Sequence, residues 1–98
     1  MLESRVYIND EAAAADIRRL REAITKLEDS LNATKRVQQT GSDMKGKTGA
    51  AITEQAARLE TQIQSLKGNL NSTIKSIQNA VNEYHERDSE LARNISRY

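Results

Sequence analysis

Cysteine, proline, tryptophan and phenylalanine are all absent from the 98-residue chain, and its aromatic residues are three tyrosines. The lack of cysteine excludes disulfides, a thiolate nucleophile and zinc-knuckle motifs. Because charged residues make up 30% of the chain, the apolar residues can fill a narrow seam between helices but not a broad globular core. The composition favours a small protein that binds other proteins and catalyses nothing.

Helix-breaking residues are confined to a few places. Proline is absent, and three of the four glycines, Gly41, Gly46 and Gly49, lie near the middle of the chain. Because a β protein needs a turn about every eight to twelve residues, this distribution excludes most all-β and α/β architectures. Two long segments that flank one break indicate an all-α fold, in a single domain covering residues 1–98.

Charges of both signs are interleaved along the chain, and its net charge is +1. The densest basic group, Arg18, Arg19 and Arg21, is bracketed by Asp16 and Glu22, as on a solvated helix face. We therefore expect no nucleic-acid partner. No long apolar run follows the first residues, so we expect neither a cleaved signal peptide nor stable membrane insertion.

The first helix is predicted over residues 9–39. Asn9 or Asp10 can cap its N-terminus, and basic residues lie near its end, where the helix dipole favours positive charge. Its apolar residues alternate four-residue and three-residue steps, like the a and d positions of a heptad repeat, and Thr34 weakens the next step. These residues are Ala13, Ile17, Leu20, Ile24, Leu27 and Leu31.

A turn is predicted within residues 40–49. Gly41 can adopt the left-handed conformation that ends a helix, and Ser42, Asp43 or Thr48 can cap the next helix. The chain therefore reverses its direction here.

The second helix is predicted over residues 50–96, with the same apolar spacing and one extra four-residue step that locally unwinds a supercoil. A short connection makes two amphipathic helices antiparallel neighbours. In the predicted pairing, residue numbers sum to about 87, so that Ile24 faces Ile63. The expected fold is an elongated, coiled-coil-like hairpin with a longer second helix.

The apolar stripe of the second helix runs past the end of the first. Such an uncovered stripe usually marks a binding surface. We predict a partner-binding seam that consists of the following heptad positions: Ile17, Leu20, Ile24, Leu27, Leu31, Leu59, Ile63, Leu66, Leu70, Ile77 and Val81.

No residue pattern indicates enzyme chemistry. His85 is the only histidine, and it has no cysteine beside it, so a solvated side chain is the simplest interpretation. A two-helix rod has no pocket to shield a catalytic triad, and the central glycines lack the spacing of a phosphate-binding loop. We predict no catalytic residue, no cofactor and no metal site.

Two short motifs stand out on this layout. Met44-Lys45-Gly46 lies in the predicted turn, and late in the second helix Tyr84 and Asp88 are spaced to share one face. With its length and hairpin layout, the chain resembles the WxG helical-hairpin superfamily of type VII secretion. That superfamily has Trp-x-Gly in the turn and a Tyr/Phe-x-x-x-Asp/Glu export signal in the second helix. Here Met44 replaces the tryptophan, unlike in standard self-dimerising members.

The chain is most similar to the divergent small hairpins that accompany LXG toxins. This resemblance implies a chaperone-like targeting factor that binds the helical N-terminal region of an LXG toxin, alone or with a second small hairpin. It also implies that Tyr84 and Asp88, which we expect beyond most of the first helix, present an export signal to the type VII machinery. The protein would pass from the bacterial cytoplasm through that system without a cleaved signal peptide.

Two alternatives remain open at this stage. The chain can instead be a structural coiled coil that homodimerises to form a scaffold. Tyr84 and Asp88 can be ordinary helix positions, since Tyr7 and Glu11 match the same short pattern.

Overall fold

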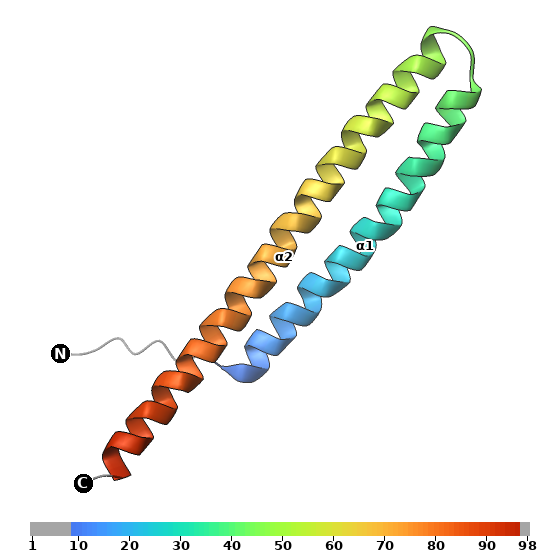
Figure 1. The fold of residues 1–98 in the computed structure, drawn as a ribbon. Helices are drawn as coiled ribbons and strands as arrows, with labels where there is room; N and C mark the ends of the chain where they lie inside the picture. The colour runs from blue at the N-terminus through green and yellow to red at the C-terminus, as the bar shows by residue number, and fades with distance from the viewer. Residues whose placement is uncertain (1–8, 97–98) are drawn as a thin grey trace, which may run out of the picture.

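The computed structural model of the protein describes residues 9–96. Two α-helices, α1 (Asp10–Asp43) and α2 (Lys47–Ser96), run antiparallel as a hairpin (Figure 1). The molecule measures 79 × 22 × 19 Å, and the described residues contain no strand. The predicted all-α, elongated two-helix hairpin with a longer second helix is confirmed. Neither helix, over the part of the chain described, is long and apolar enough to cross a membrane.

The start of α1 is set by a side-chain cap. Asn9 is extended, with φ −86° and ψ 111°, and its Oδ1 accepts a hydrogen bond of 3.1 Å from the backbone N–H of Ala12. This bond satisfies one of the N–H groups that a helix N-terminus leaves without an intrahelical partner. Asp10 is the first helical residue, so its side chain is not used in capping.

The turn is shorter than predicted, because α1 continues to Asp43 and only residues 44–46 separate the helices. The prediction for Gly41 is wrong: this residue is helical and buried, and the glycine with positive φ (92°) is Gly46. A Cβ on Gly41 would lie 2.7 Å from Thr53 Oγ1. Glycine is therefore needed at this position for the close approach of α2, not for a left-handed backbone.

The predicted caps of α2 are also wrong. Ser42 and Asp43 belong to α1, where Ser42 Oγ donates a hydrogen bond of 3.1 Å to the Gln38 carbonyl, and Thr48 lies inside α2. Gly46 precedes α2 and its carbonyl accepts the first backbone hydrogen bond of that helix, at 3.2 Å. Glycine is acceptable at an N-cap, although it has no side-chain acceptor.

The two helices pair one heptad away from the predicted register. Gly41 lies against Thr53 and Asp10 against His85, so the numbers of facing residues sum to 94 and 95. Because both apolar stripes repeat every seven residues, a shift of seven still sets apolar positions against apolar positions. The stripes alone cannot distinguish the two registers, and the prediction that Ile24 faces Ile63 is wrong.

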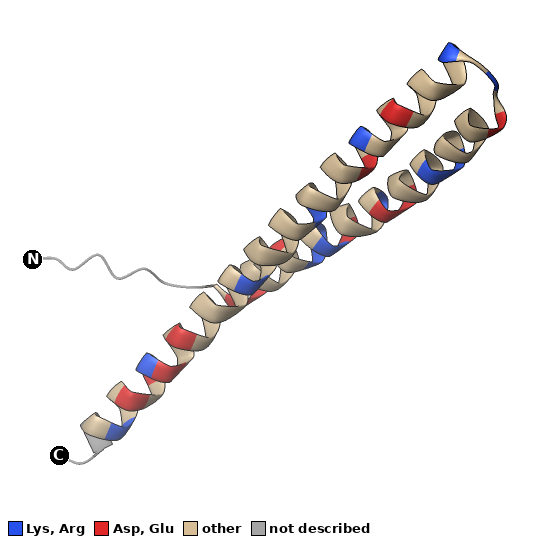
Figure 2. Ribbon diagram, turned by 45° about the horizontal axis from the view of Figure 1, so that its top comes forward, with Lys and Arg blue, Asp and Glu red and all other residues tan. Residues whose placement is uncertain are grey.

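Charged residues beside the seam distinguish the two registers. Figure 2 shows residues of both signs along both helices. The observed register places Lys35 opposite Glu60, and Glu28 opposite Lys67. In the register predicted from the stripes, Glu28 would instead lie opposite Glu60, and Arg21 opposite Lys67. Like charges that face one another are unfavourable, so this pattern opposes the slipped pairing.

The core is a thin line of side chains between the helices. Its buried apolar residues are Leu31, Ala56, Ile63 and Ile74, all 5–7% exposed. Thr34 is also buried, and its hydroxyl donates a hydrogen bond of 2.8 Å to the Ser30 carbonyl, which satisfies the polar group. Thr34 is therefore part of the core, although it interrupts the apolar heptad pattern.

Candidate functional site

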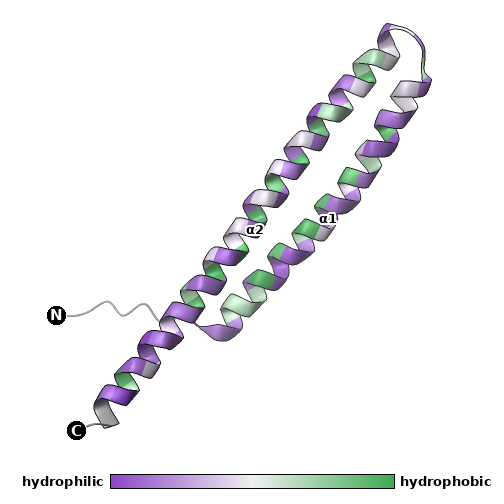
Figure 3. Ribbon diagram, viewed as in Figure 1, coloured by the Kyte–Doolittle hydropathy of each residue, from purple (hydrophilic) through white to green (hydrophobic). Residues whose placement is uncertain are grey.

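The apolar stripe of α2 is wider than the seam that α1 covers. Leu59 and Leu66, both predicted seam residues, remain 48% and 46% exposed, whereas Ile63 between them is 7% exposed. At 100° per residue, Leu59 and Leu66 lie on one side of the buried line. Figure 3 shows apolar positions recurring along both helices of the hairpin.

The first helix adds to this exposed surface near the turn. Val37 is 51% exposed, and it lines a shallow groove of about 360 Å³ together with Ile52 and Leu59 of α2. We call Val37, Ile52, Leu59 and Leu66 the apolar flank. These four residues lie on the same side of the seam in the turn-proximal half, and they have the character of a surface that another helix covers.

The side of the seam opposite the apolar flank carries charged residues in the turn-proximal half, where the helical periodicity places Glu28, Lys35, Glu60 and Lys67. Nearer the open end, a groove on that side is lined by both apolar and charged residues of α1, among them Ile17, Arg18 and Arg21. These α1 residues lie on the far side of the seam from Val37, according to the helical periodicity. In the turn-proximal half, the apolar flank and the charged residues therefore lie on opposite sides of the seam.

The rest of the predicted seam lies between the helices or at its margins. Leu31 and Ile63 are buried, and Leu59 and Leu66 belong to the apolar flank. The others are half-buried; they are Ile17, Leu20, Ile24, Leu27, Leu70, Ile77 and Val81. Heptad spacing does not distinguish residues of the seam from residues of the apolar flank, so all of these were predicted to form one surface. Val37 was not predicted, because it is outside the a and d series.

The turn motif coincides with the observed turn. Met44 is the first residue after α1 and is 42% exposed. Gly46 is the last residue before α2 and carries the positive φ. Both residues were singled out from the sequence, and the structure places them two positions apart at the tip of the hairpin, where the bulky Met44 side chain is accessible.

The predicted export-signal residues lie where α1 begins and α2 continues past it. Tyr84 is half-buried, level with the first turn of α1, while Asp88 is one helical turn further on and exposed. Tyr84 is therefore less free of α1 than we expected, because the register shift extends the overlap by one heptad. From His85 to Ser96, α2 projects roughly 16 Å past the start of α1.

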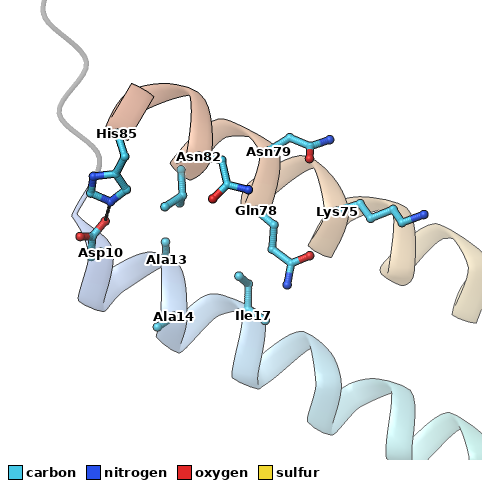
Figure 4. Close-up of a pocket in the computed structure, with 10 residues that line it drawn as sticks. Asp10, Ala13, Ala14, Ile17, Lys75, Gln78, Asn79, Asn82 and His85 are labelled. Carbon is cyan, nitrogen blue, oxygen red and sulfur yellow. Dashed lines mark hydrogen bonds and ion pairs between the residues drawn. The ribbon is translucent and has the colours of Figure 1, made fainter. Parts of the chain in front are cut away.

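The open end of the hairpin carries a polar contact that the sequence did not indicate. His85 Nε2 lies 3.0 Å from Asp10 Oδ1, and both side chains are more than half exposed. Figure 4 shows this pair at one end of a groove. The groove has a volume of about 700 Å³, and its lining includes Ala13, Ile17 and Val81. His85 is thus paired, not simply solvated.

The groove is open to solvent and has little chemistry to offer. Besides the Asp10–His85 pair, Lys75 is its charged residue, with Gln78, Asn79 and Asn82 as neutral polar neighbours. Across the described residues, no group of three or more His, Cys, Asp or Glu side chains is placed to hold a metal ion. The exposed apolar and polar surfaces suit recognition of another protein.

The fold and these surfaces are those of an elongated helical hairpin that leaves large apolar side chains exposed beside its seam. A family model for WXG100, proteins of 100 residues with WXG, matches residues 7–89. The chain belongs to this family, the small helical proteins associated with type VII secretion, although it has no tryptophan. Comparison with curated proteins and with solved structures gave no match.

Proposed function

We propose that this protein is a type VII targeting factor that binds the helical N-terminal region of an LXG-type toxin and displays an export signal. Its role is association and display, without catalysis. The apolar flank receives the toxin helix, and Tyr84 and Asp88 are read by the export machinery. The role in type VII secretion follows from the family, and the LXG-type partner follows from the resemblance to LXG-associated hairpins.

The observation that carries the proposal is the uncovered apolar flank. Leu59, Leu66 and Val37 are each about half exposed on one face, and burying such side chains contributes about 25 cal/mol per Å² of apolar surface removed from water. A helix with apolar residues at heptad spacing would cover them in the way α1 covers Ile63. The charged residues across the seam, among them Lys35 and Glu60, would remain in water.

Display of the signal is supported by the projecting end of α2. Tyr84 and Asp88 are one helical turn apart and share a face, and Asp88 lies beyond α1. An aromatic residue can fill a receptor pocket while a carboxylate next to it fixes orientation through charge complementarity. The partner site near the turn and the signal at the open end are separate, so both can be used together.

Co-expression with the toxin N-terminal region tests the binding role. The double variant Leu59→Gln/Leu66→Gln should lose capture of the toxin region, because it removes the apolar surface without emptying the seam. Gln64→Ala changes an exposed residue on the other side of α2 and is the matched control. Undiminished capture by the double variant would contradict the proposed surface.

Export of the pair tests the signal. Asp88→Asn and, separately, Tyr84→Ala should lower export while helicity, thermal stability and toxin capture stay near wild type. Glu86→Gln removes a nearby exposed carboxylate that points away from Tyr84, and it should export normally. If Tyr84→Ala unfolds the hairpin, Tyr84 is a seam residue and the recognition role is wrong.

A homodimeric scaffold is the second candidate, and the same exposed flank favours it, because a second copy can cover Leu59 and Leu66. Light scattering distinguishes the two. A targeting factor should exchange any self-association for a complex with the toxin region, whereas a scaffold should remain a dimer in its presence.

A further inference from the structure

The contact between Asp10 and His85 joins the first turn of α1 to the middle of the Tyr84–Asp88 segment. The two residues are 75 positions apart in sequence, and the Nε2–Oδ1 distance is 3.0 Å. An ionised carboxylate can only accept hydrogen bonds, so Nε2 of His85 carries the proton and donates. Figure 4 shows the imidazole reaching from α2 to the carboxylate across the end of the groove.

His85 also touches the tyrosine of the candidate signal. The ring centroids of Tyr84 and His85 are 5.7 Å apart, with an interplanar angle of 73°. This edge-to-face arrangement is one of the favoured geometries of aromatic rings. The Asp10 carboxylate therefore holds the imidazole, and the imidazole limits the positions open to the Tyr84 ring.

We infer that Asp10 and His85 form a clasp that positions Tyr84, so that the Tyr84–Asp88 pair is presented in its binding geometry only when α1 is docked in the observed register. Asp10 and His85 are thus positioning residues for the signal. The inference deepens the proposed function and rests on it where export is concerned. The clasp itself is independent of that function.

The position of the clasp makes it sensitive to closure of the hairpin. Asp10 lies at the very start of α1, and helix ends open more readily than helix centres. A slip of one heptad would move Asp10 about 10 Å along α2 and release His85. A receptor that requires an ordered Tyr84 would then discriminate closed hairpins from open or slipped ones.

Because the pair is exposed, its effect on the position of the Tyr84 ring can be measured apart from the folding stability of the hairpin. The Asp10 and His85 side chains are 61% and 51% exposed, and such exposed pairs change an equilibrium by at most roughly five-fold. Loss of the clasp should therefore leave the hairpin folded while it frees the Tyr84 ring. A residue with only a structural role would lower the thermal stability without a selective effect on one tyrosine.

The test uses the full chain with isotope-labelled tyrosine, in which Tyr84→Phe assigns the Tyr84 ring signals. Asp10→Ala should move these signals toward those of a freely rotating tyrosine, with unchanged helicity. Asp10→Asn keeps an acceptor for Nε2 and should restore part of the wild-type signal. Asp16→Ala removes another exposed carboxylate of α1, one that pairs with Arg19 at 3.7 Å within the helix, and should have no effect. Unchanged Tyr84 signals in Asp10→Ala would overturn the clasp.

Export measurements then test the coupling to the signal. Asp10→Ala should lower export by roughly two- to five-fold, the range expected for loss of an exposed pair, with partial recovery in Asp10→Asn. If Tyr84→Ala reduces export but Asp10→Ala frees the ring and exports normally, the coupling is wrong. If Tyr84→Ala exports normally, Tyr84 is not part of an export signal, and the coupling of the clasp to export is wrong as well. The ring signals of Tyr84 still show in that case whether the clasp exists.

Discussion

Gly41 lies so close to Thr53 that a Cβ added to the glycine would be 2.7 Å from Thr53 Oγ1 and 3.0 Å from its backbone nitrogen. The Thr53 hydroxyl cannot simply move away, because it donates a hydrogen bond of 2.9 Å to the Gly49 carbonyl. Gly49 in turn lies against the carbonyl groups of Met44 and Gly41. The helices therefore cross at backbone contact distance just below the turn.

Alanine at these positions should destabilise the hairpin although alanine is the better helix former. We expect Gly41→Ala and Gly49→Ala to cost about 1–3 kcal/mol, as overpacking does. Gly68→Ala is the matched control, since Gly68 is helical with nothing within 4 Å of an added Cβ, and it should gain about 1 kcal/mol. Thermal unfolding measures all three. A rise in Tm for Gly41→Ala would show that the helices separate there without cost.

Gly46 requires glycine for a different reason. Its φ is 92°, but an added Cβ would meet nothing within 4 Å. Replacement by L-alanine should cost about 1–3 kcal/mol through backbone strain alone. D-alanine, introduced by chemical synthesis, favours positive φ and should stabilise the turn by restricting the unfolded chain. Equal Tm values for the two alanine enantiomers would contradict this explanation.

Charge reversal should weaken the observed register. The double variant Glu60→Lys/Lys67→Glu sets like charges opposite Lys35 and Glu28, and we expect their repulsion to cost at most about 1 kcal/mol per pair. Tm should fall, and reversing Lys35 and Glu28 as well should restore it. If Tm does not return to the wild-type value when all four charges are reversed, other residues also contact these four.

The register itself can be measured, because the chain has no native cysteine to interfere with labelling. Spin labels on Asn32→Cys/Gln64→Cys should be closer together than labels on Thr25→Cys/Gln64→Cys. The difference corresponds to a shift of about 10 Å along the axis. The opposite order of distances would mean that the hairpin pairs in the register predicted from the apolar stripes.

Seam and flank residues should respond differently to truncation. Ile63 is buried, so Ile63→Ala should cost the free hairpin about 2–5 kcal/mol. Leu66 is 46% exposed, so Leu66→Ala should cost the free hairpin much less and act mainly on partner binding. Calorimetry of the free chain and titration with the partner give both values. Equal losses of folding stability would place Leu66 in the seam.

The helices, the position of the turn and the apolar stripes could be predicted from the amino-acid sequence. Helices follow from local properties: the absence of proline, the Asn9 cap and the heptad spacing act within a few residues of chain. The motif residues Met44 and Gly46 could also be placed in the turn, because glycines cluster there. Each of these features depends on interactions between residues that are near in sequence.

The register of the two helices, and the contacts that depend on it, could not be predicted without the three-dimensional structure. A seven-residue repeat looks the same after a shift of seven, so the stripes could not choose between two pairings of the helices. The close contact of Gly41 with Thr53 belongs to the observed register, and the alternative register would set like charges opposite one another. Two further features depend on which residues of α1 lie beside which residues of α2. One is that Ile63 is buried while Leu66 is exposed, and the other is the contact between Asp10 and His85.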